Sequence, residues 1–103
     1  MFARLSIFDD VDLSLEEQAR EWMTTEGLRL SRALPGYQGL MTLIDRDSRR
    51  VVGIGLYDNE ENARQADELL NQAPPESLPE ELRRALPARS FVGLFDVVER
   101  EGI

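Results

Sequence analysis

The chain has 103 residues, of which 42% are hydrophobic, and its formal net charge is −8 because 20 acidic residues outnumber 12 basic ones. This length suits one domain over residues 1–103 with a single shallow core, and the acidic charge argues against nucleic acid and anionic membranes as partners. Cysteine and histidine are both absent, which excludes disulfides, thiolate metal sites, a cysteine nucleophile and a Ser-His-Asp triad.

The first predicted elements are a strand and a helix. Residues 2–8 form a short apolar run of β-compatible side chains that ends at two aspartates, so they predict a strand. Ser14 and Glu17 have the spacing of a capping box, and a helix should therefore begin near Leu15. Its apolar residues recur at helical spacing until the Pro-Gly pair at 35–36 ends it.

A hairpin and a second helix follow. Residues 37–45 and 50–57 predict two strands, and the short polar turn between them predicts antiparallel pairing. Asp58 and Glu61 repeat the capping-box spacing before a second helix, predicted over roughly 59–72. The buried side of this helix is expected at Ala63, Ala66, Leu69 and Leu70.

The last part of the chain contains a proline-rich connection and a final strand. Pro74-Pro75 should break the chain, a short helical turn is expected around 78–86 before Pro87, and residues 90–98 predict a strand. The order β-α-β-β-α-β predicts an α+β, ferredoxin-like domain with a four-stranded antiparallel sheet and both helices on one face.

Neither face of that sheet has the alternating polar residues that a solvated face requires. One face is expected to be aliphatic apart from Asp96. Helices would cover one of the two faces, and a second subunit is the natural cover for the other, so we predict a homodimer that pairs through its sheets. The aliphatic face is expected to consist of Ala3, Leu5, Ile7, Val52, Ile54, Leu56, Val92 and Leu94.

The opposite face combines glycines with polar residues. Glycine within a strand often marks the close approach of another group, so this face has room for a small-molecule ligand bordered by Ser6, Trp22, Gly53 and Gly55. The alternative is that the glycines accept large side chains from the first helix, notably Trp22, as in ordinary core packing. The members expected on this face are Arg4, Ser6, Gly39, Gly53, Gly55, Tyr57 and Gly93.

Three residues are candidates for chemistry. A guanidinium on an inner strand, at Arg4, needs either a protein carboxylate or an anionic group of a ligand. Glu26 lies four residues after Trp22, near the buried stripe, where its pKa would be raised and it would act as a base. Alternatively it pairs with an arginine, either Arg4 or Arg29, or reaches solvent at the edge of the helix face. The phenol of Tyr57 either reaches into an opening or bonds to the backbone.

Metal, membrane and export signals are all weak. Asp9, Asp10 and Asp12 lack the spacing of a calcium loop and more simply favour the N-terminus of the following helix, so we expect no metal site. No stretch approaches the roughly 18 apolar residues of a membrane span. The N-terminus turns acidic too early for a signal peptide, and we expect a soluble, cytoplasmic protein.

Three segments of the chain resemble a known family pattern: PGYQG at 35–39, DRDS at 45–48 and GLYDNEENA at 55–63. The pattern is a Pro-Gly-aromatic-x-Gly strand start, an acidic hairpin turn, and a strand that runs into Trp-x-(Ser/Asn)-x-Glu-x-Ala. The chain thus resembles the dimeric α/β-barrel superfamily, and within it the antibiotic-biosynthesis-monooxygenase-like proteins. The resemblance extends over residues 2–98.

The resemblance implies sheets paired face to face into a barrel, with a cleft between the sheet and the helices of each subunit. Some members of the family are oxygenases that need no cofactor and act on polycyclic phenols, which themselves reduce dioxygen. The haem-degrading branch needs a histidine ligand, which this sequence lacks. The family tryptophan at the end of the third strand is Tyr57 here.

Two functional hypotheses follow from the resemblance. In the first, the protein is a monooxygenase without a cofactor: Arg4 supplies positive charge, Glu26 or Tyr57 handles the proton, and Trp22 lines an apolar wall. In the second, the protein is a non-catalytic ligand-binding or structural dimer module of the same fold. The lost tryptophan and the absent histidine favour the second hypothesis.

Overall fold

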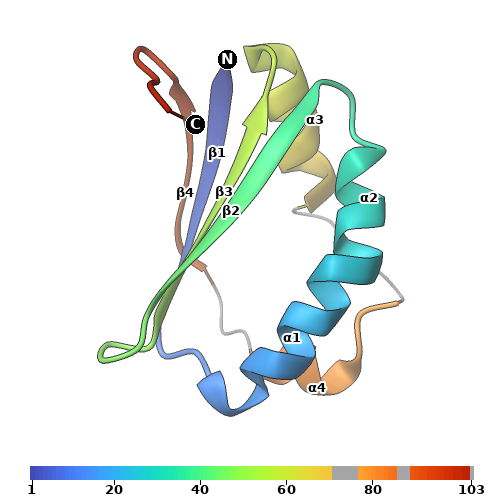
Figure 1. The fold of residues 1–103 in the computed structure, drawn as a ribbon, viewed down its shortest axis with the longest axis vertical. Helices are drawn as coiled ribbons and strands as arrows, with labels where there is room; N and C mark the ends of the chain where they lie inside the picture. Colours follow the sequence, from blue (N-terminus) through green and yellow to red (C-terminus); the bar gives the residue numbers. More distant parts are fainter. Residues whose placement is uncertain (71–76, 86–88, 103) are drawn as a thin grey trace.

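A computed structural model describes residues 1–70, 77–85 and 89–102 and has the predicted ferredoxin-like α+β fold (Figure 1). Its strands pair antiparallel throughout, in the order β2-β3-β1-β4. The first three strands have the predicted bounds, whereas the last spans Arg89–Asp96 instead of 90–98. The strands are β1 (Phe2–Phe8), β2 (Tyr37–Asp45), β3 (Arg50–Tyr57) and β4 (Arg89–Asp96).

The first helical segment is divided into four pieces instead of being one continuous α-helix. Its beginning also differs from the prediction, because Asp12 rather than Ser14 is the cap: the Ser14 backbone N–H donates to the Asp12 carboxylate at 3.0 Å. The pieces are the 3₁₀ turn η1 (Leu13–Leu15), α1 (Glu16–Trp22), the π-helical turn η2 (Met23–Gly27) and α2 (Leu28–Arg32).

The π-helical turn has a local chemical cause. A π turn pairs residue i with i+5, so it changes which backbone carbonyls find a donor. The hydroxyl of Thr24 donates to the carbonyl of Arg20 at 2.9 Å, and that of Thr25 donates to the carbonyl of Glu21, also at 2.9 Å. Gly27 lies close to Met23, and a Cβ there would come within 2.6 Å of the Met23 sulfur.

The second long helix, α3 (Glu60–Leu70), is capped by Asn59 and not by Asp58: the Asn62 N–H donates to the Asn59 side chain at 2.9 Å. Two of the four residues predicted on its buried side are buried, Ala63 and Ala66. Leu69 and Leu70 are instead exposed, because only the first half of the helix packs on the core cluster around Tyr57. Residues 71 and 72 lie outside the described residues.

A short helix, α4 (Glu80–Ala85), lies where a short helical turn was predicted around 78–86. Its end is held by a backbone hydrogen bond of 3.3 Å from the Asp12 N–H to the Ala85 carbonyl. Leu82 is buried and faces the interior of the domain. The predicted break at Pro74-Pro75 and the stop at Pro87 fall outside the described residues.

All helices lie on one side of the sheet and leave the other side uncovered (Figure 1). We call this uncovered side the open face. The pairing register gives its apolar members, which are Ala3, Leu5, Ile7, Met41, Leu43, Val52, Ile54, Leu56, Phe91 and Phe95. The four that lie on the outer strands β2 and β4 are between 40% and 46% exposed.

The face assignment of β4 is a correction to the prediction. Leu94 pairs with Arg4 and packs against the core, so it and Val92 lie on the helix-covered side. Phe91 and Phe95 lie on the open face in their place, with ring centroids 6.1 Å apart. Both faces of β4 are apolar, and alternation alone therefore could not decide which residues point to the helices.

The core is small and lies where α3 packs against the sheet. Tyr57, Ala63 and Ala66 form its buried centre. The rings of Tyr57 and Tyr37 meet edge to face, with centroids 6.4 Å apart. Because α3 supplies this core, the half of the sheet beneath α1 is packed differently, and the candidate site lies there.

Candidate functional site

A cavity of about 530 Å³ lies between the sheet and the first helical segment. The sheet contributes Leu40, Ile44 and Val51 to its wall, and α4 closes it with Leu82. Most of its surface is apolar, as in binding sites for small organic molecules, which commonly occupy 300–1,000 Å³. The cavity is on the side of the sheet where the sequence predicted a cleft.

Gly53 forms part of the cavity wall on β3. A Cβ built on Gly53 meets no heavy atom within 4 Å, so the space above it is open. Gly55 differs, because a Cβ there would lie 3.2 Å from the ring of Tyr57. Of the two glycines predicted to border a ligand, only Gly53 opens onto the cavity, and Trp22 does not fill the space over it.

Two other glycines, expected beside Arg4, are on the opposite side of the sheet. Gly39 pairs with Leu56 and Gly93 pairs with Leu5, which places both on the open face. Gly93 lies between two phenylalanine rings, since a Cβ there would come within 2.8 Å of Phe91. These two glycines therefore contribute nothing to the cavity.

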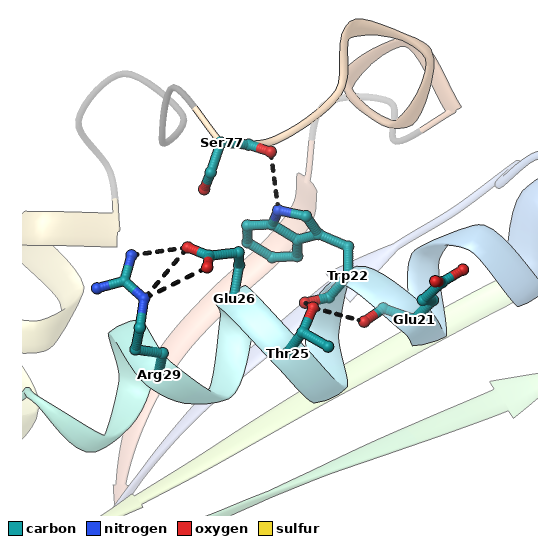
Figure 2. Close-up of polar contacts among 6 residues, drawn as sticks. All are labelled: Glu21, Trp22, Thr25, Glu26, Arg29 and Ser77. Carbon is teal, nitrogen blue, oxygen red and sulfur yellow. Dashed lines mark hydrogen bonds and ion pairs between the residues drawn. The ribbon is translucent and has the colours of Figure 1, made fainter.

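Trp22 lies at the end of α1 and lines the cavity. Its indole is half-buried, and Nε1 donates to the Ser77 carbonyl at 3.0 Å, as Figure 2 shows. This bond links α1 to the segment that leads into α4. The side chain is thus a wall of the cavity and a strut between two elements, whereas the sequence favoured a core role.

Glu26 does not have the raised pKa that a buried base would need. Its carboxylate faces Arg29, with 2.7 Å between Oε2 and Nη2 (Figure 2), and this guanidinium lowers the pKa of Glu26. The expectation assumed a buried, unpaired carboxyl, whereas the Glu26 side chain is 39% exposed and bonded to Arg29. The alternative of an arginine partner is the one confirmed.

Arg4 is buried on β1, with 7% of its surface exposed. Its Nε donates to the Asp67 carboxylate of α3 at 2.8 Å, and its Nη1 donates to the Ser6 hydroxyl at 3.0 Å. Its Nη2 has no hydrogen-bond partner among residues 1–70, 77–85 and 89–102. A protein carboxylate therefore neutralises Arg4 and leaves one donor unused.

Tyr57 is 3% exposed and packs in the core, off the cavity wall. Burial raises the pKa of its phenol, and the nearby positive charge of Arg4 partly opposes that shift. The phenol does not reach into the opening that one hypothesis proposed for it. Its ring covers Gly55 instead.

The cavity also has polar wall residues that sequence reasoning missed. Glu16 pairs with Arg20 at 3.1 Å and with Arg46 of the β2-β3 turn, and Arg46 is the main cause of the lowered pKa of Glu16. The i,i+4 spacing of Glu16 and Arg20 was visible in the sequence, but the approach of Arg46 depends on the fold. Thr42 of β2 also lines the cavity and was not predicted to do so.

The aspartates after β1 form ion pairs with nearby arginines or cap the following helix. Asp9 pairs with Arg50 at 2.6 Å and Asp10 with Arg49 at 3.4 Å, while Asp12 is the cap. Within the described ranges, no group of three or more histidine, cysteine, aspartate or glutamate side chains is arranged to hold a metal ion. No helix of the same residues is both long and apolar enough to cross a bilayer.

No family model and no curated protein matches the sequence. Among solved structures, the chain is similar to a crystal structure of an MhuD variant with two manganese protoporphyrin IX molecules bound per active site (TM-score 0.70, 14% identity, 99% of both chains covered). It is also similar to the heme-degrader MhuD from Mycobacterium tuberculosis with two hemes bound in its active site (TM-score 0.65, 12% identity, 99% of this chain and 100% of that chain). The likeness shows the fold alone. The predicted ferredoxin-like fold is confirmed.

Proposed function

We propose that this protein is a homodimer that binds an aromatic, largely apolar small molecule in the cavity between its sheet and α1. One observation carries the proposal: a cavity of about 530 Å³ has apolar walls and an open floor at Gly53. The size and lining are those of ligand sites. The structural neighbours hold porphyrins, which are flat polycyclic molecules, and this supports the ligand class.

The residues present do not fit a haem iron. The usual protein ligands of haem iron are histidine, a cysteine thiolate, tyrosine, or methionine together with histidine. The sequence has no histidine and no cysteine. Tyr57 lies in the core, and among the described residues the cavity wall offers only the thioether of Met23, because the Met41 side chain points to the open face. We therefore propose a metal-free site.

A second copy of the chain is the proposed cover of the open face. Four strands about 4.8 Å apart, each of about seven residues that rise about 3.3 Å, make that face roughly 20 by 23 Å. Apolar patches of this extent are uncommon on monomers. The sheet-to-sheet pairing implied by the family resemblance would bury it. The expected cytoplasmic location stays a prediction.

The second candidate function is a monooxygenase that acts on a polycyclic phenol without a cofactor. In that reaction a ring methylene of the substrate's keto form becomes a carbonyl: one oxygen atom of O₂ enters the product and the other leaves as water with the two hydrogens. This hypothesis assigns the positive charge for an anionic substrate to Arg4, which is buried on β1 and paired with Asp67. Tyr57 or Glu26 would handle the proton.

Binding without catalysis is better supported than oxygenation. Glu26 is partly exposed and ion-paired with Arg29, its pKa is lowered, and it is not on the cavity wall. Tyr57 is removed from the cavity wall by its packing in the core. Neither proposed base therefore lies on the cavity wall, and the wall carboxylates Asp12 and Glu16 are engaged in a helix cap and in ion pairs with arginines, whereas binding alone requires no base.

Thermal melts with two- and three-ring aromatics test ligand binding. A compound at ten times its Kd should stabilise the protein by about 1.4 kcal/mol, a rise in Tm of about 6 °C. Gly53→Leu should remove the rise because the new side chain occupies the cavity, while the unliganded melt of the variant checks that it folds. A panel that moves neither Tm nor ligand partitioning in dialysis would contradict the proposal.

Oxygen consumption separates the two candidates. Compounds that bind are incubated aerobically, and an oxygen electrode compares anthrone-like substrates with and without protein. Stoichiometric uptake that is lost in Arg4→Lys or Tyr57→Phe would support the monooxygenase. Binding with no uptake above the uncatalysed rate would leave the binding module and eliminate the oxygenase.

A further inference from the structure

The cavity opens to solvent between α1 and β2. Its most buried wall residues are Val11, 5% exposed, and Leu82 of α4, 4% exposed, and they mark its closed end. The exposed wall residues include Thr42 of β2 together with Ala19 and Arg20 of α1. Because β2 is the last strand at its edge of the sheet, a ligand can enter and leave along this side. We call the opening between α1 and β2 the mouth of the cavity.

One ion pair joins the two sides of the mouth. Arg46 follows β2 in the turn to β3, and its guanidinium bonds both carboxylate oxygens of Glu16 at the start of α1: Nη1 donates to Oε1, and Nη2 donates to Oε2 at 3.1 Å. A two-point pair of this kind fixes the relative orientation of its partners. Between residues 37–57 of the hairpin and 16–22 of α1, all of which the structure describes, no other hydrogen bond or ion pair is formed.

The Glu16 carboxylate has a second partner that does not cross the mouth. Arg20, one turn further along α1, pairs with the same Oε2 at 3.1 Å, so this contact stays within one helix. Arg46 is nevertheless the largest cause of the lowered pKa of Glu16, and Glu16 in turn raises the pKa of Arg46. Both groups are therefore charged at neutral pH, and the contact between the hairpin and α1 depends on Arg46.

We propose that the Glu16–Arg46 pair is a latch, a contact that must break before the mouth can widen to pass a ligand. The role of this latch in ligand exchange rests on the proposed binding function. Exposed ion pairs are weak, so the latch slows access about threefold and does not block it. The pair is broken in the open state whether the cavity is empty or filled. Its loss should therefore raise the association and dissociation rates together and leave Kd unchanged.

A thiol placed inside the cavity measures opening of the mouth without any ligand. The chain has no cysteine, so Gly53→Cys supplies a single thiol, and the open space over Gly53 accommodates it. The rate at which N-(1-pyrenyl)maleimide, an uncharged and flat polycyclic reagent, labels this thiol is followed by fluorescence. In this parent variant, Arg46→Gln should raise the labelling rate about threefold. Loss of a nearby cation would by itself slow a thiolate reaction, so the increase reports access to the cavity.

Arg20→Gln is the matched control. It removes an arginine from the same carboxylate but keeps the contact with the hairpin, so the labelling rate should not change. Glu16→Gln should accelerate labelling as Arg46→Gln does, and it replaces that variant if Arg46→Gln fails to fold. The double variant should label no faster than either single variant, because each change removes the same interaction. Sodium chloride at about 1 M should accelerate the parent but not Arg46→Gln, since salt screens exposed charges.

The labelling results separate the latch from the proposed function. If Arg46→Gln and Arg20→Gln label at the same rate, the latch is overturned, whatever the ligand panel shows. A double variant whose rate is the product of the two single effects would also overturn it, because Glu16 and Arg46 would then act independently. If labelling responds as expected but no ligand of the panel binds, the latch stands and the proposed binding function fails. Thermal melts check that each variant is folded at the labelling temperature.

Discussion

Gly27 and Gly53 both lie inside regular structure, yet their surroundings are opposite. A Cβ at Gly27 would come within 2.6 Å of Met23, whereas one at Gly53 meets nothing within 4 Å. Gly27→Ala should therefore push the flexible Met23 side chain aside and lose part of the gain of about 1 kcal/mol that alanine brings inside a helix. Gly53→Ala should be neutral or stabilising by about 0.4–1 kcal/mol, because the unfolded chain loses freedom. Urea titrations measure both, and equal losses would contradict the packing described.

The buried phenol of Tyr57 makes stability depend on alkaline pH. Burial raises its pKa in the folded state, while in the unfolded chain the phenol ionises near pH 10. The stability from this shift is complete below about pH 10 and is lost as pH rises through the folded-state pKa. Tyr57→Phe should flatten that loss in urea titrations between about pH 9 and 11. Parallel losses in variant and wild type would mean that the phenol ionises freely.

At the scale of single residues, the sequence indicated which residues need a partner or leave open space, but not which groups they contact in the fold. Arg4 was recognised as a buried cation in need of a partner, but Asp67 could be named only once α3 was placed against β1. Gly53 and Gly55 looked equivalent in the sequence, and only the position of the Tyr57 ring separates them. The raised pKa expected for Glu26 was wrong, because Arg29 pairs with its carboxylate and lowers the pKa; the sequence offered this pairing only as an alternative.

Among the helices and strands, too, some features could be predicted from the sequence and others could not. Three strands were predicted to the residue because apolar runs end at turn residues, and the hairpin follows from the polar turn between two of them. The π turn η2 has no periodic signal, since the apolar spacing continues through it. The faces of β4 could not be assigned because both are apolar, and a one-residue shift exchanges them.

The hydrogen bond from Trp22 to Ser77, which joins α1 to the segment before α4, leads to a prediction about these two helices. Trp22→Phe keeps an aromatic wall but removes the N–H that donates to Ser77. We expect the variant to be less stable by about 1 kcal/mol and to exchange the amides of residues 80–85 faster. Hydrogen exchange read by mass spectrometry measures this, with β1 amides as the internal control. Unchanged exchange in α4 would show that the bond does not hold this element.

For the whole molecule, the open face decides whether the domain exists alone. Its apolar side chains occupy a face with no helix on it, in a chain whose net charge is −8. The absence of polar alternation in the strands predicted this face from the sequence, although β4 contributes Phe91 and Phe95 instead of its aliphatic residues. Ile54 is on the inner strand β3, at the centre of the face.

Sedimentation velocity at micromolar concentration measures most directly whether a second copy covers this face. The wild type should sediment at twice the chain mass of 11.7 kDa. Ile54→Glu should sediment as single folded subunits, because an unpaired charge in an apolar interface costs several kcal/mol. A wild-type protein that is monomeric under these conditions, or an Ile54→Glu variant that stays dimeric, would contradict pairing through the sheets.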